Sequence, residues 1–281
     1  VMDGQAYRRH IQKEAAREPR APLYLAPETE TWVGLDGPAL RVSRMDSADR
    51  FFPLARIARV HTSPRADWEQ AALLACADAG IPVLFVDDNG RVIARVLGRP
   101  GERDELRDRL VEFLLRPEAT GMLRHWLDRN RQRAARWAAI KLGWRPTTER
   151  AAEIRRRINK TAKRLAGPES AEHSRQWLRG LAYGWMEAHL VALGFAASTE
   201  LAQVGQPALA ADLTDILFWY LEPARLGWLM RRALAAERKR EPLRPPTYRV
   251  AVMLFESGPA RVATRGHEIT SCLHRWLIHE T

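Results

Sequence analysis

Two aspartates three residues apart have the type and spacing that metal chemistry would need. Asp212 and Asp215 lie in the stretch LAQVGQPALAADLTDI, residues 201–216, shortly after a turn that contains glycine. A helix would place both carboxylates on one face, where they could hold a divalent metal ion over a bound nucleic acid. Aspartate is also favoured in the first turn of any helix by the helix dipole. The stretch alone leaves both interpretations open.

Positive charge is concentrated in one segment of the chain. The 281 residues include 45 Lys and Arg against 34 Asp and Glu, a net charge of +11. Residues 124–164 alone contain 14 Lys and Arg against 3 Asp and Glu, so this segment carries the whole excess. A solvated helix normally intersperses acidic residues, whereas so one-sided a run repels itself unless a polyanion neutralises it. The segment therefore predicts phosphate binding, and its DNA-binding candidates are Arg131, Arg133, Arg136, Lys141, Arg145, Arg155, Arg156, Arg157, Lys160, Lys163 and Arg164.

The tryptophans of the basic segment have two possible roles. Trp126, Trp137 and Trp144 could pack in the core, which is the commoner fate of this residue, or stack on splayed bases.

Several other chemistries find no support in the sequence. It contains no P-loop, paired-glycine dinucleotide fingerprint, HExxH or GxSxG motif. Its histidines do not form a zinc-ligand pattern, and Cys76 and Cys272 are too few for a disulfide framework. The low cysteine content favours a reducing cytoplasm. No apolar run is long enough to span a membrane, so we expect a soluble protein without a membrane partner.

The N-terminal third is typical of a strand-rich domain. Residues 22–98 alternate in short apolar bursts that turn residues interrupt. The DNG sequence at residues 88–90 separates VLFV from RVIARV and predicts a β-hairpin. Between strands, ADWEQAALLACADAG has helical apolar spacing and ends on Gly80, a suitable helix cap. One helix among strands is therefore expected.

The rest of the chain is typical of helices. After a polar linker near residue 100, apolar spacing predicts helices over 104–115, 118–142, 147–166, 170–193, 207–220 and 223–240. In the tail, YRVAVMLF predicts a strand and EITSCLHRWLIHE a short helix. The fold class is α+β, with a small N-terminal β domain at 1–98 joined to a larger α-helical domain at 99–281.

Two stretches resemble the CRISPR-associated spacer-integrase family, the first-numbered of the Cas proteins. Residues 55–98, which include GIPVLFVDDNGR, are similar to the end of that family's N-terminal β domain. Residues 181–217 are similar to its "YG…EA…GY" helix, followed by a loop and a D-x-x-D helix. The order of the two stretches along the chain also agrees with the family.

The resemblance implies a function in CRISPR adaptation. The β domain would mediate a homodimer, and the helical domain would bind protospacer and CRISPR-repeat DNA. A small second-numbered Cas protein would bridge two dimers. Catalysis in the family is strand transfer by a DNA 3′ hydroxyl at a Mg²⁺ or Mn²⁺ site made of a Glu, a His and an Asp.

The family's site is incomplete when it is carried onto this sequence. Its helix aspartates fall on Asp212 and Asp215, with Asp215 as the better match for the ligand, and its histidine falls on Gln203. Glutamine can offer a carbonyl oxygen to a metal ion but cannot exchange a proton. The family's interval for the glutamate leads into residues 124–141, which contain no Glu, and the nearest ones are Glu118, Glu149 and Glu153. These substitutions predict a DNA-binding member with impaired or lost catalysis.

Two alternatives remain open at this point. One is an active metal-dependent integrase or endonuclease whose ligands lie elsewhere in the sequence. The other is a basic nucleic-acid-binding module unrelated to CRISPR, which a neighbouring CRISPR array would exclude.

Overall fold

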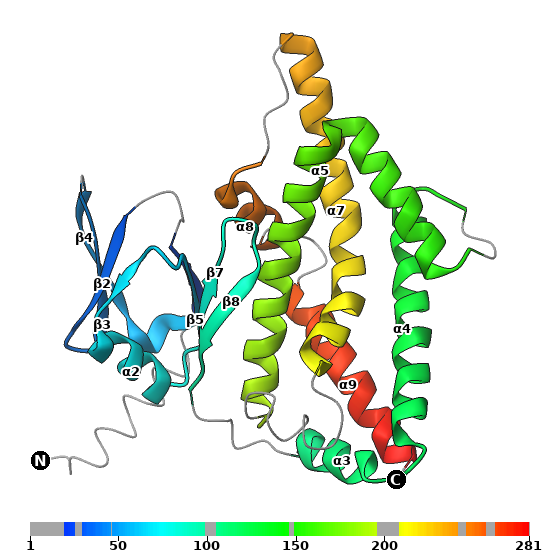
Figure 1. The fold of residues 1–281 in the computed structure, drawn as a ribbon, viewed down its shortest axis with the longest axis horizontal. Helices are drawn as coiled ribbons and strands as arrows, with labels where there is room; N and C mark the ends of the chain where they lie inside the picture. Colours follow the sequence, from blue (N-terminus) through cyan, green and yellow to red (C-terminus); the bar gives the residue numbers. More distant parts are fainter. Residues whose placement is uncertain are drawn as a thin grey trace, which may run out of the picture. The chain divides into compact units, whose positions relative to one another are not determined.

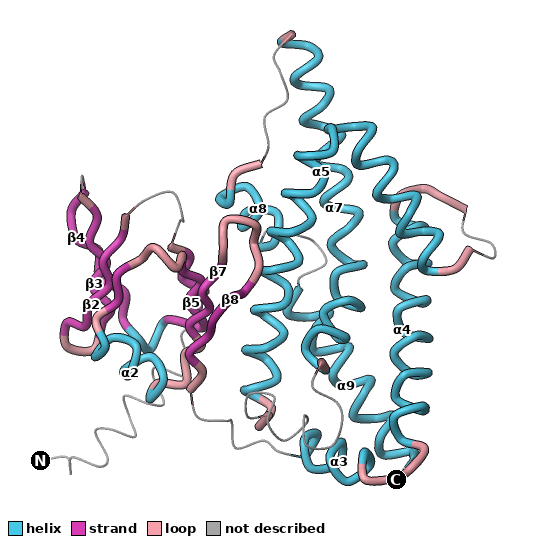
Figure 2. Tube along the Cα trace, in the orientation of Figure 1, coloured by secondary structure: helices cyan, strands magenta, loops and turns pink. Residues whose placement is uncertain are grey.

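The computed structural model describes residues 20–25, 30–45, 47–98, 105–145, 149–195, 208–240, 246–256 and 262–280. The chain divides into two compact units (Figure 1). The first comprises Val1–Asp88 and Val92–Arg99, and the second comprises Asn89–Arg91 and Pro100–Thr281. Strands dominate the first unit and helices the second (Figure 2), which confirms the α+β class.

The first unit contains two four-stranded sheets. One has the strand order β1 (Ala21–Tyr24), β5 (Ile57–Thr62), β7 (Val83–Val86) and β8 (Val92–Val96). The other has the order β4 (Ser47–Pro53), β3 (Ala39–Arg44), β2 (Thr31–Asp36) and β6 (Asp67–Trp68). A short 3₁₀ helix, η1 (Leu54–Arg56), follows β4.

The predicted hairpin and helix of this unit are both confirmed. Strands β7 and β8 pair antiparallel, with Val83 opposite Val96. Gly90 has a φ of 80°, which is the left-handed conformation that a tight turn needs and that glycine adopts without strain. Helix α2 (Gln70–Asp78) ends just before Gly80, as its apolar spacing predicted.

The core of the first unit is built from both sheets and from α2. Val33 and Leu40 of one sheet, Val60 and Val83 of the other, and Cys76 of α2 are fully buried in one cluster. Burial raises the pKa of the Cys76 thiol to about 11 because the thiolate would be poorly solvated there. Cys76 is therefore a core residue.

The second unit is a set of packed helices. They are α3 (Glu105–Leu114), α4 (Ala119–Lys141), α5 (Ala151–Ala192), α7 (Leu209–Lys239), α8 (Tyr248–Glu256) and α9 (Val262–Glu280). Helix α5 joins the two helices expected over 147–166 and 170–193, with a kink where Gly167 leaves the helical conformation ahead of Pro168. Helices α4 and α5 both pack against α7, which therefore forms the centre of the unit (Figure 1).

Two predictions for this unit are wrong. The break expected at Pro223 is absent, because α7 continues through this residue while Glu222 and Arg225 beside it are fully buried. The strand expected at YRVAVMLF is helix α8, which buries Tyr248, Ala251 and Leu254 at a spacing of three residues. That spacing follows the helical period, whereas the sequence of short β-branched and aromatic residues had favoured a strand.

Two further features complete the fold. Helix α9 starts at Val262, six residues before the helix expected at EITSCLHRWLIHE. In the part of the chain that the structure describes, no helix has the length and apolar character needed to cross a membrane.

Candidate functional site

Asp212 lies in the first turn of α7, and its carboxylate is held by α4. Nη2 of Arg131 donates a hydrogen bond to Oδ1 of Asp212 at 2.5 Å, and Nη1 of the same guanidinium contacts Asp128 at 3.0 Å. Burial raises the pKa of Asp212, and the positive charge of Arg131 opposes that rise. The arginine therefore keeps a half-buried carboxylate paired.

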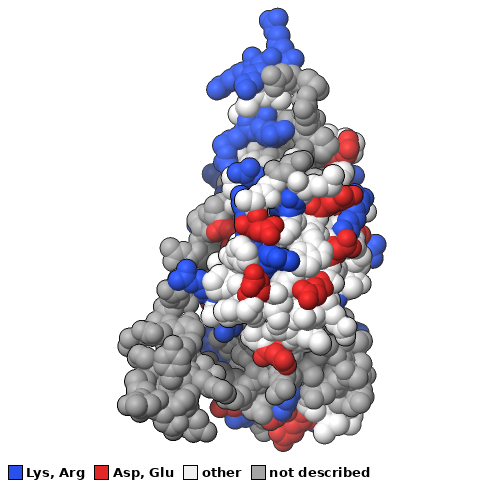
Figure 3. All heavy atoms as spheres, turned by 90° about the vertical axis from the view of Figure 1, so that its left-hand side faces the viewer, with Lys and Arg blue, Asp and Glu red and all other residues white. Residues whose placement is uncertain are grey.

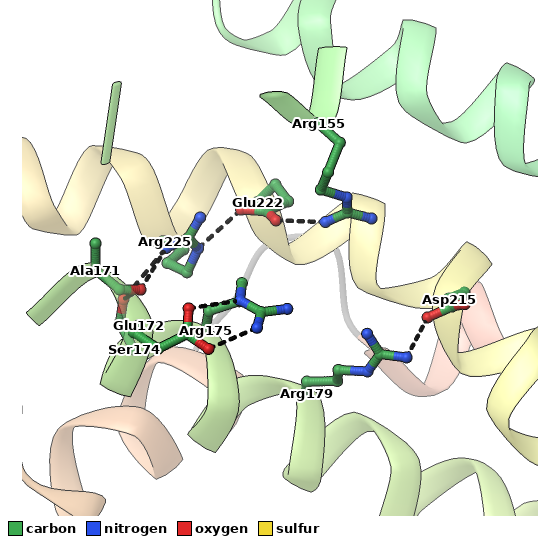
Figure 4. A network of polar contacts seen from close by, with 9 residues as sticks. All are labelled: Arg155, Ala171, Glu172, Ser174, Arg175, Arg179, Asp215, Glu222 and Arg225. Carbon is green, nitrogen blue, oxygen red and sulfur yellow. Dashed lines mark hydrogen bonds and ion pairs between the residues drawn. The ribbon is translucent and has the colours of Figure 1, made fainter. Parts of the chain in front are cut away.

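Asp215, almost one helical turn further along α7, pairs with a different helix. Nη2 of Arg179, on α5, lies 2.6 Å from its Oδ1 (Figure 4). The two aspartates are thus each neutralised by an arginine from a separate neighbouring helix. The structure brings them to one end of α7 but fills the space beside each carboxylate with a guanidinium.

Glu222, about two turns further along α7, lies at the centre of a buried charged network (Figure 4). Its two carboxylate oxygens accept hydrogen bonds from Nη1 of Arg155 at 2.7 Å and from Nε of Arg225 at 2.8 Å. The side chains of Glu222 and Arg225 are both 0% exposed. Nη1 of Arg225 also donates to the carbonyl oxygen of Ala171 at 3.1 Å and to Oγ of Ser174 at 3.3 Å. These contacts join the kinked middle of α5 to α7.

Arg155 connects this network to aromatic side chains. Its guanidinium carbon lies 3.7 Å from the ring centroid of Trp219, close enough for a cation–π interaction. Burial lowers the pKa of Arg155, and Glu222 and Asp215 oppose that change. This arginine, a DNA-binding candidate in the sequence, is therefore engaged inside the helical unit.

Two of the three glutamates that could complete a metal site have other side-chain contacts. Glu118 directly precedes α4, and Glu149 pairs with Arg157 at 3.5 Å. Glu153 accepts a hydrogen bond from the backbone N–H of Arg150 at 2.7 Å and caps α5. Gln203 lies outside the described residues. Among the residues the structure does describe, no three His, Cys, Asp or Glu side chains form a group that could hold a metal ion. The described side chains that contact Asp212 and Asp215 are guanidinium groups, which carry positive charge and cannot ligate a cation.

The other basic candidates are mostly exposed. Arg131 and Arg155 lie in the ion pairs described above. The remaining candidates reach solvent from α4, from α5 and from the segment between them: Arg133, Arg136, Lys141, Arg145, Arg156, Arg157, Lys160, Lys163 and Arg164. A second concentration of Lys and Arg, which the sequence analysis missed, lies at the C-terminal end of α7 (Figure 3) and includes Arg238, Lys239 and Arg240.

The arginines that neutralise the acidic side chains of α7 were also missed. Arg225 follows Glu222 by three residues, so a helical pair could have been expected from the sequence. Arg179 carries no comparable signal, because its partner lies 36 residues away on another helix. Only helix packing brings Arg179 to Asp215.

A histidine pair lies between α5 and α9. The ring centroids of His189 and His267 are 4.4 Å apart, and Nε2 of His189 lies 3.0 Å from Oγ1 of Thr270. The ring of Trp185 stacks on His189. Burial, together with the nearby His267, lowers the pKa of His189 to about 4.

We expect this histidine to make the protein sensitive to acid. In the unfolded chain His189 takes up a proton below about pH 6.5, whereas in the folded protein its pKa is about 4. The free energy of unfolding is therefore unaffected by this group above pH 6.5. It falls by about 3 kcal/mol as the pH decreases from 6.5 towards 4. Urea unfolding of wild type and His189→Gln at pH 7 and pH 4.5 checks this. The loss on acidification should be smaller in the variant, and equal losses would contradict it.

Comparison with known proteins agrees with this architecture. A family model described as "CRISPR associated protein Cas1" matches residues 23–183, which is more than half of the chain. No curated protein matches the chain in sequence.

Several solved structures share the fold at low sequence identity. TM1797, a CAS1 protein from Thermotoga maritima, has a TM-score of 0.67 at 11% identity, over 92% of this chain and 96% of that one. A casposase bound to an integration product has a TM-score of 0.68 at 12% identity, over 92% and 91%. TtCas1 in complex with DNA has a TM-score of 0.61 at 16% identity, over 91% and 92%. The family match confirms the resemblance seen in the sequence, and the chain belongs to the Cas1 family of CRISPR-associated proteins, the integrases of CRISPR adaptation.

Proposed function

We propose that this protein acts in CRISPR adaptation by binding protospacer and repeat DNA, and that its own strand-transfer activity is impaired or lost. The observation that carries this proposal is the pairing of Asp212 with Arg131 at 2.5 Å. Asp215 pairs with Arg179 in the same way, and position 203 is a glutamine. Both features support impaired strand transfer.

The ion pairs oppose metal binding for a simple electrostatic reason. Cas1 proteins generally use divalent metal ions, which need carboxylate oxygens that are open to the cation. A guanidinium group pairs with those oxygens and adds positive charge beside the place where the metal would lie. At about 4 Å and an effective dielectric constant of about 20, each unit of like charge costs about 4 kcal/mol before solvent screening. The site therefore favours an arginine counter-ion over a metal.

DNA binding is supported by the exposed cations. The basic side chains of α4 and α5 that reach solvent carry the charge that a phosphate backbone would neutralise. Among proteins of the same fold, TtCas1 is seen in complex with DNA and a casposase is bound to an integration product. We therefore propose DNA binding for this chain on the basis of its exposed positive charge.

Assembly is part of the proposal. We expect a homodimer through the β domain at 1–98, supported by exposed apolar side chains such as Met45, Phe51 and Ile93. The domain at 99–281 would bind DNA, and the small second-numbered Cas protein would join the dimer. Light scattering that shows a monomer at micromolar concentration, unchanged by DNA, would exclude the dimer.

The proposed function predicts an unusual response to loss of Asp215. Purified protein should bind branched or 3′-overhang DNA but show only weak strand transfer with Mg²⁺ or Mn²⁺. Asp215→Ala should leave that low rate within about twofold of wild type, whereas losing a principal electrostatic stabiliser costs an active enzyme about 100- to 1000-fold. A strand-transfer assay on a supercoiled plasmid that carries a CRISPR repeat measures both rates.

The same assay can overturn the proposal. Strong metal-dependent strand transfer that Asp215→Ala abolishes would show an active integrase whose ligand set includes side chains outside the described residues. Asp108→Asn serves as a control, because this exposed carboxylate pairs with Arg107 on α3 and is not a candidate ligand.

A further inference from the structure

The last turns of α7 project from the helical unit, and we call residues 230–240 the α7 arm. Figure 1 shows that this end of α7 extends beyond α4 and α5. The buried side chains of α7 end at Leu229, and none of residues 230–240 is buried. A short helix in water depends mainly on the packing of an apolar face for its stability. The α7 arm therefore continues the helix without the packing that holds the rest of α7.

Two large apolar side chains lie on one face of the α7 arm. Met230 and Leu234 are each 48% exposed. Because they are four residues apart, they are neighbours on the helix surface. Burial of such side chains against a second apolar surface is favourable, and a flexible methionine adapts to surfaces of different shape. The pair therefore marks a place where another apolar surface can pack.

Positive charge borders this apolar pair. Arg231 lies three residues before Leu234 and Arg238 lies four residues after it, so both are next to Leu234 on the helix surface. The α7 arm contains five Lys and Arg and a single acidic residue, Glu237 (Figure 3). With the described residues of the chain, neither Arg231 nor Arg238 forms an ion pair. The α7 arm thus combines an apolar stripe with a positive border.

We propose that the α7 arm docks an acidic amphipathic helix of another protein. The apolar residues of that helix would cover Met230 and Leu234, and its Asp and Glu side chains would pair with Arg231 and Arg238. A helix that packs on an apolar stripe, with complementary charge at the border, is a common form of protein recognition. The α7 arm includes none of the residues proposed above to bind DNA, so this inference does not depend on DNA binding.

Two other polyanions fit the α7 arm less well. The phosphates of DNA would neutralise the arginines but would leave Met230 and Leu234 in water, because a phosphate backbone offers little apolar surface. An anionic membrane offers negative charge and apolar surface together. Helices that lie on membranes bury a broad apolar face that usually includes aromatic residues, and residues 230–240 contain none. An acidic helix matches both the narrow stripe and its border.

Synthetic peptides test this proposal on the full-length protein by fluorescence anisotropy. The first peptide is an amphipathic helix with leucines at heptad positions a and d and glutamates beside them. The second has lysines in place of the glutamates, and the third is a scrambled form of the first. We expect micromolar binding of the first peptide and binding about tenfold weaker or less for the others, because one lacks the negative charge and the other lacks the apolar stripe.

A matched pair of variants tests the apolar stripe. Leu234→Ser should weaken binding of the acidic peptide by about tenfold, because the leucine loses its apolar contact. Leu115→Ser changes a leucine that is 72% exposed just after α3 and should leave peptide binding unchanged. Circular dichroism confirms that both variants fold. Both should also keep the affinity of wild type for duplex DNA.

A second pair of variants tests the positive border. Arg231→Ala/Arg238→Ala should weaken binding of the acidic peptide by about tenfold and reduce its dependence on salt concentration. Arg109→Ala/Arg249→Ala removes the same charge from exposed positions on α3 and α8 and should change neither quantity.

Several results would overturn the proposal. If the acidic peptide binds Leu234→Ser as tightly as wild type, the α7 arm is not its docking surface. If Leu234→Ser instead abolishes binding to phosphatidylserine vesicles, the arm binds membranes, and if it lowers the mass seen by light scattering, the arm contacts a second copy of this chain. If the double arginine variant loses affinity for duplex DNA, the arm binds DNA. In each case, duplex binding by wild type remains the separate test of the proposed function.

Discussion

Arg131→Glu is expected to create a divalent-metal site at Asp212 and Asp215. The change removes the guanidinium that holds Asp212 and places a third carboxylate on α4, opposite the two on α7. The local charge changes by two units, and carboxylates from two separate elements are the ligands that Mg²⁺ and Mn²⁺ prefer. We expect Mn²⁺ affinity, measured by isothermal titration calorimetry, to rise by about 10- to 100-fold over wild type.

Thermal unfolding gives a second measurement of the same change. The new carboxylate repels those of Asp212 and Asp128, which Arg131 pairs in the wild type, so the melting temperature of Arg131→Glu should fall in a chelator and recover with Mn²⁺. Arg131→Gln removes the cation without adding a ligand and should bind Mn²⁺ only weakly. Arg129→Glu makes the same charge change on the exposed face of α4 and should gain nothing. Wild type that binds Mn²⁺ as tightly as Arg131→Glu would contradict the role given to Arg131.

Glu222→Gln is expected to produce a large loss of stability. Glu222 and Arg225 are both fully buried, and the glutamate is the shared partner of Arg155 and Arg225. Without the carboxylate, two cations remain close together and one of them has no contact with water. Breaking one partner of a buried ion pair costs about 3–5 kcal/mol of unfolding free energy. Urea unfolding followed by circular dichroism measures the loss.

Two variants separate this effect from a general loss of charge. Glu172→Gln breaks a partly exposed pair with Arg175 and should cost less than about 1 kcal/mol. Glu222→Leu combined with Arg225→Met removes both fully buried charges and should be much less destabilising than Glu222→Gln, because no charge is left buried on α7. If Glu222→Gln unfolds at the same urea concentration as wild type, the network does not stabilise the helical unit.

Local sequence patterns were enough to predict much of the fold. The hairpin at residues 88–90 depends on a turn whose backbone conformation favours Asn and Gly, and α2 depends on apolar residues at helical spacing. Both signals involve neighbours in sequence. Helix α8 was mistaken for a strand because its nine residues are rich in types that strands favour, and burial against other helices decided the outcome.

The sequence by itself determined the chemical types present at the site. It placed Asp212 and Asp215 on one helix, a glutamine at position 203, and a dense run of arginines at 124–164. From the arginines it was possible to predict phosphate binding. The incomplete metal site was expected from the resemblance to the spacer-integrase family, whose histidine falls on Gln203, and it stays a prediction.

The tertiary structure decided which charges meet. Arg131 reaches Asp212 across 81 residues of sequence, and Arg155 reaches Glu222 across 67. Within one run of arginines, some turn inward to hold carboxylates while Arg129 and Arg133 turn outward and line a surface hollow beside α4. The inward and the outward side chains are all arginines of the same segment, so their residue type does not distinguish them. The difference comes from the side of α4 that α7 covers, because a buried charge must find a counter-ion whereas an exposed one is solvated by water.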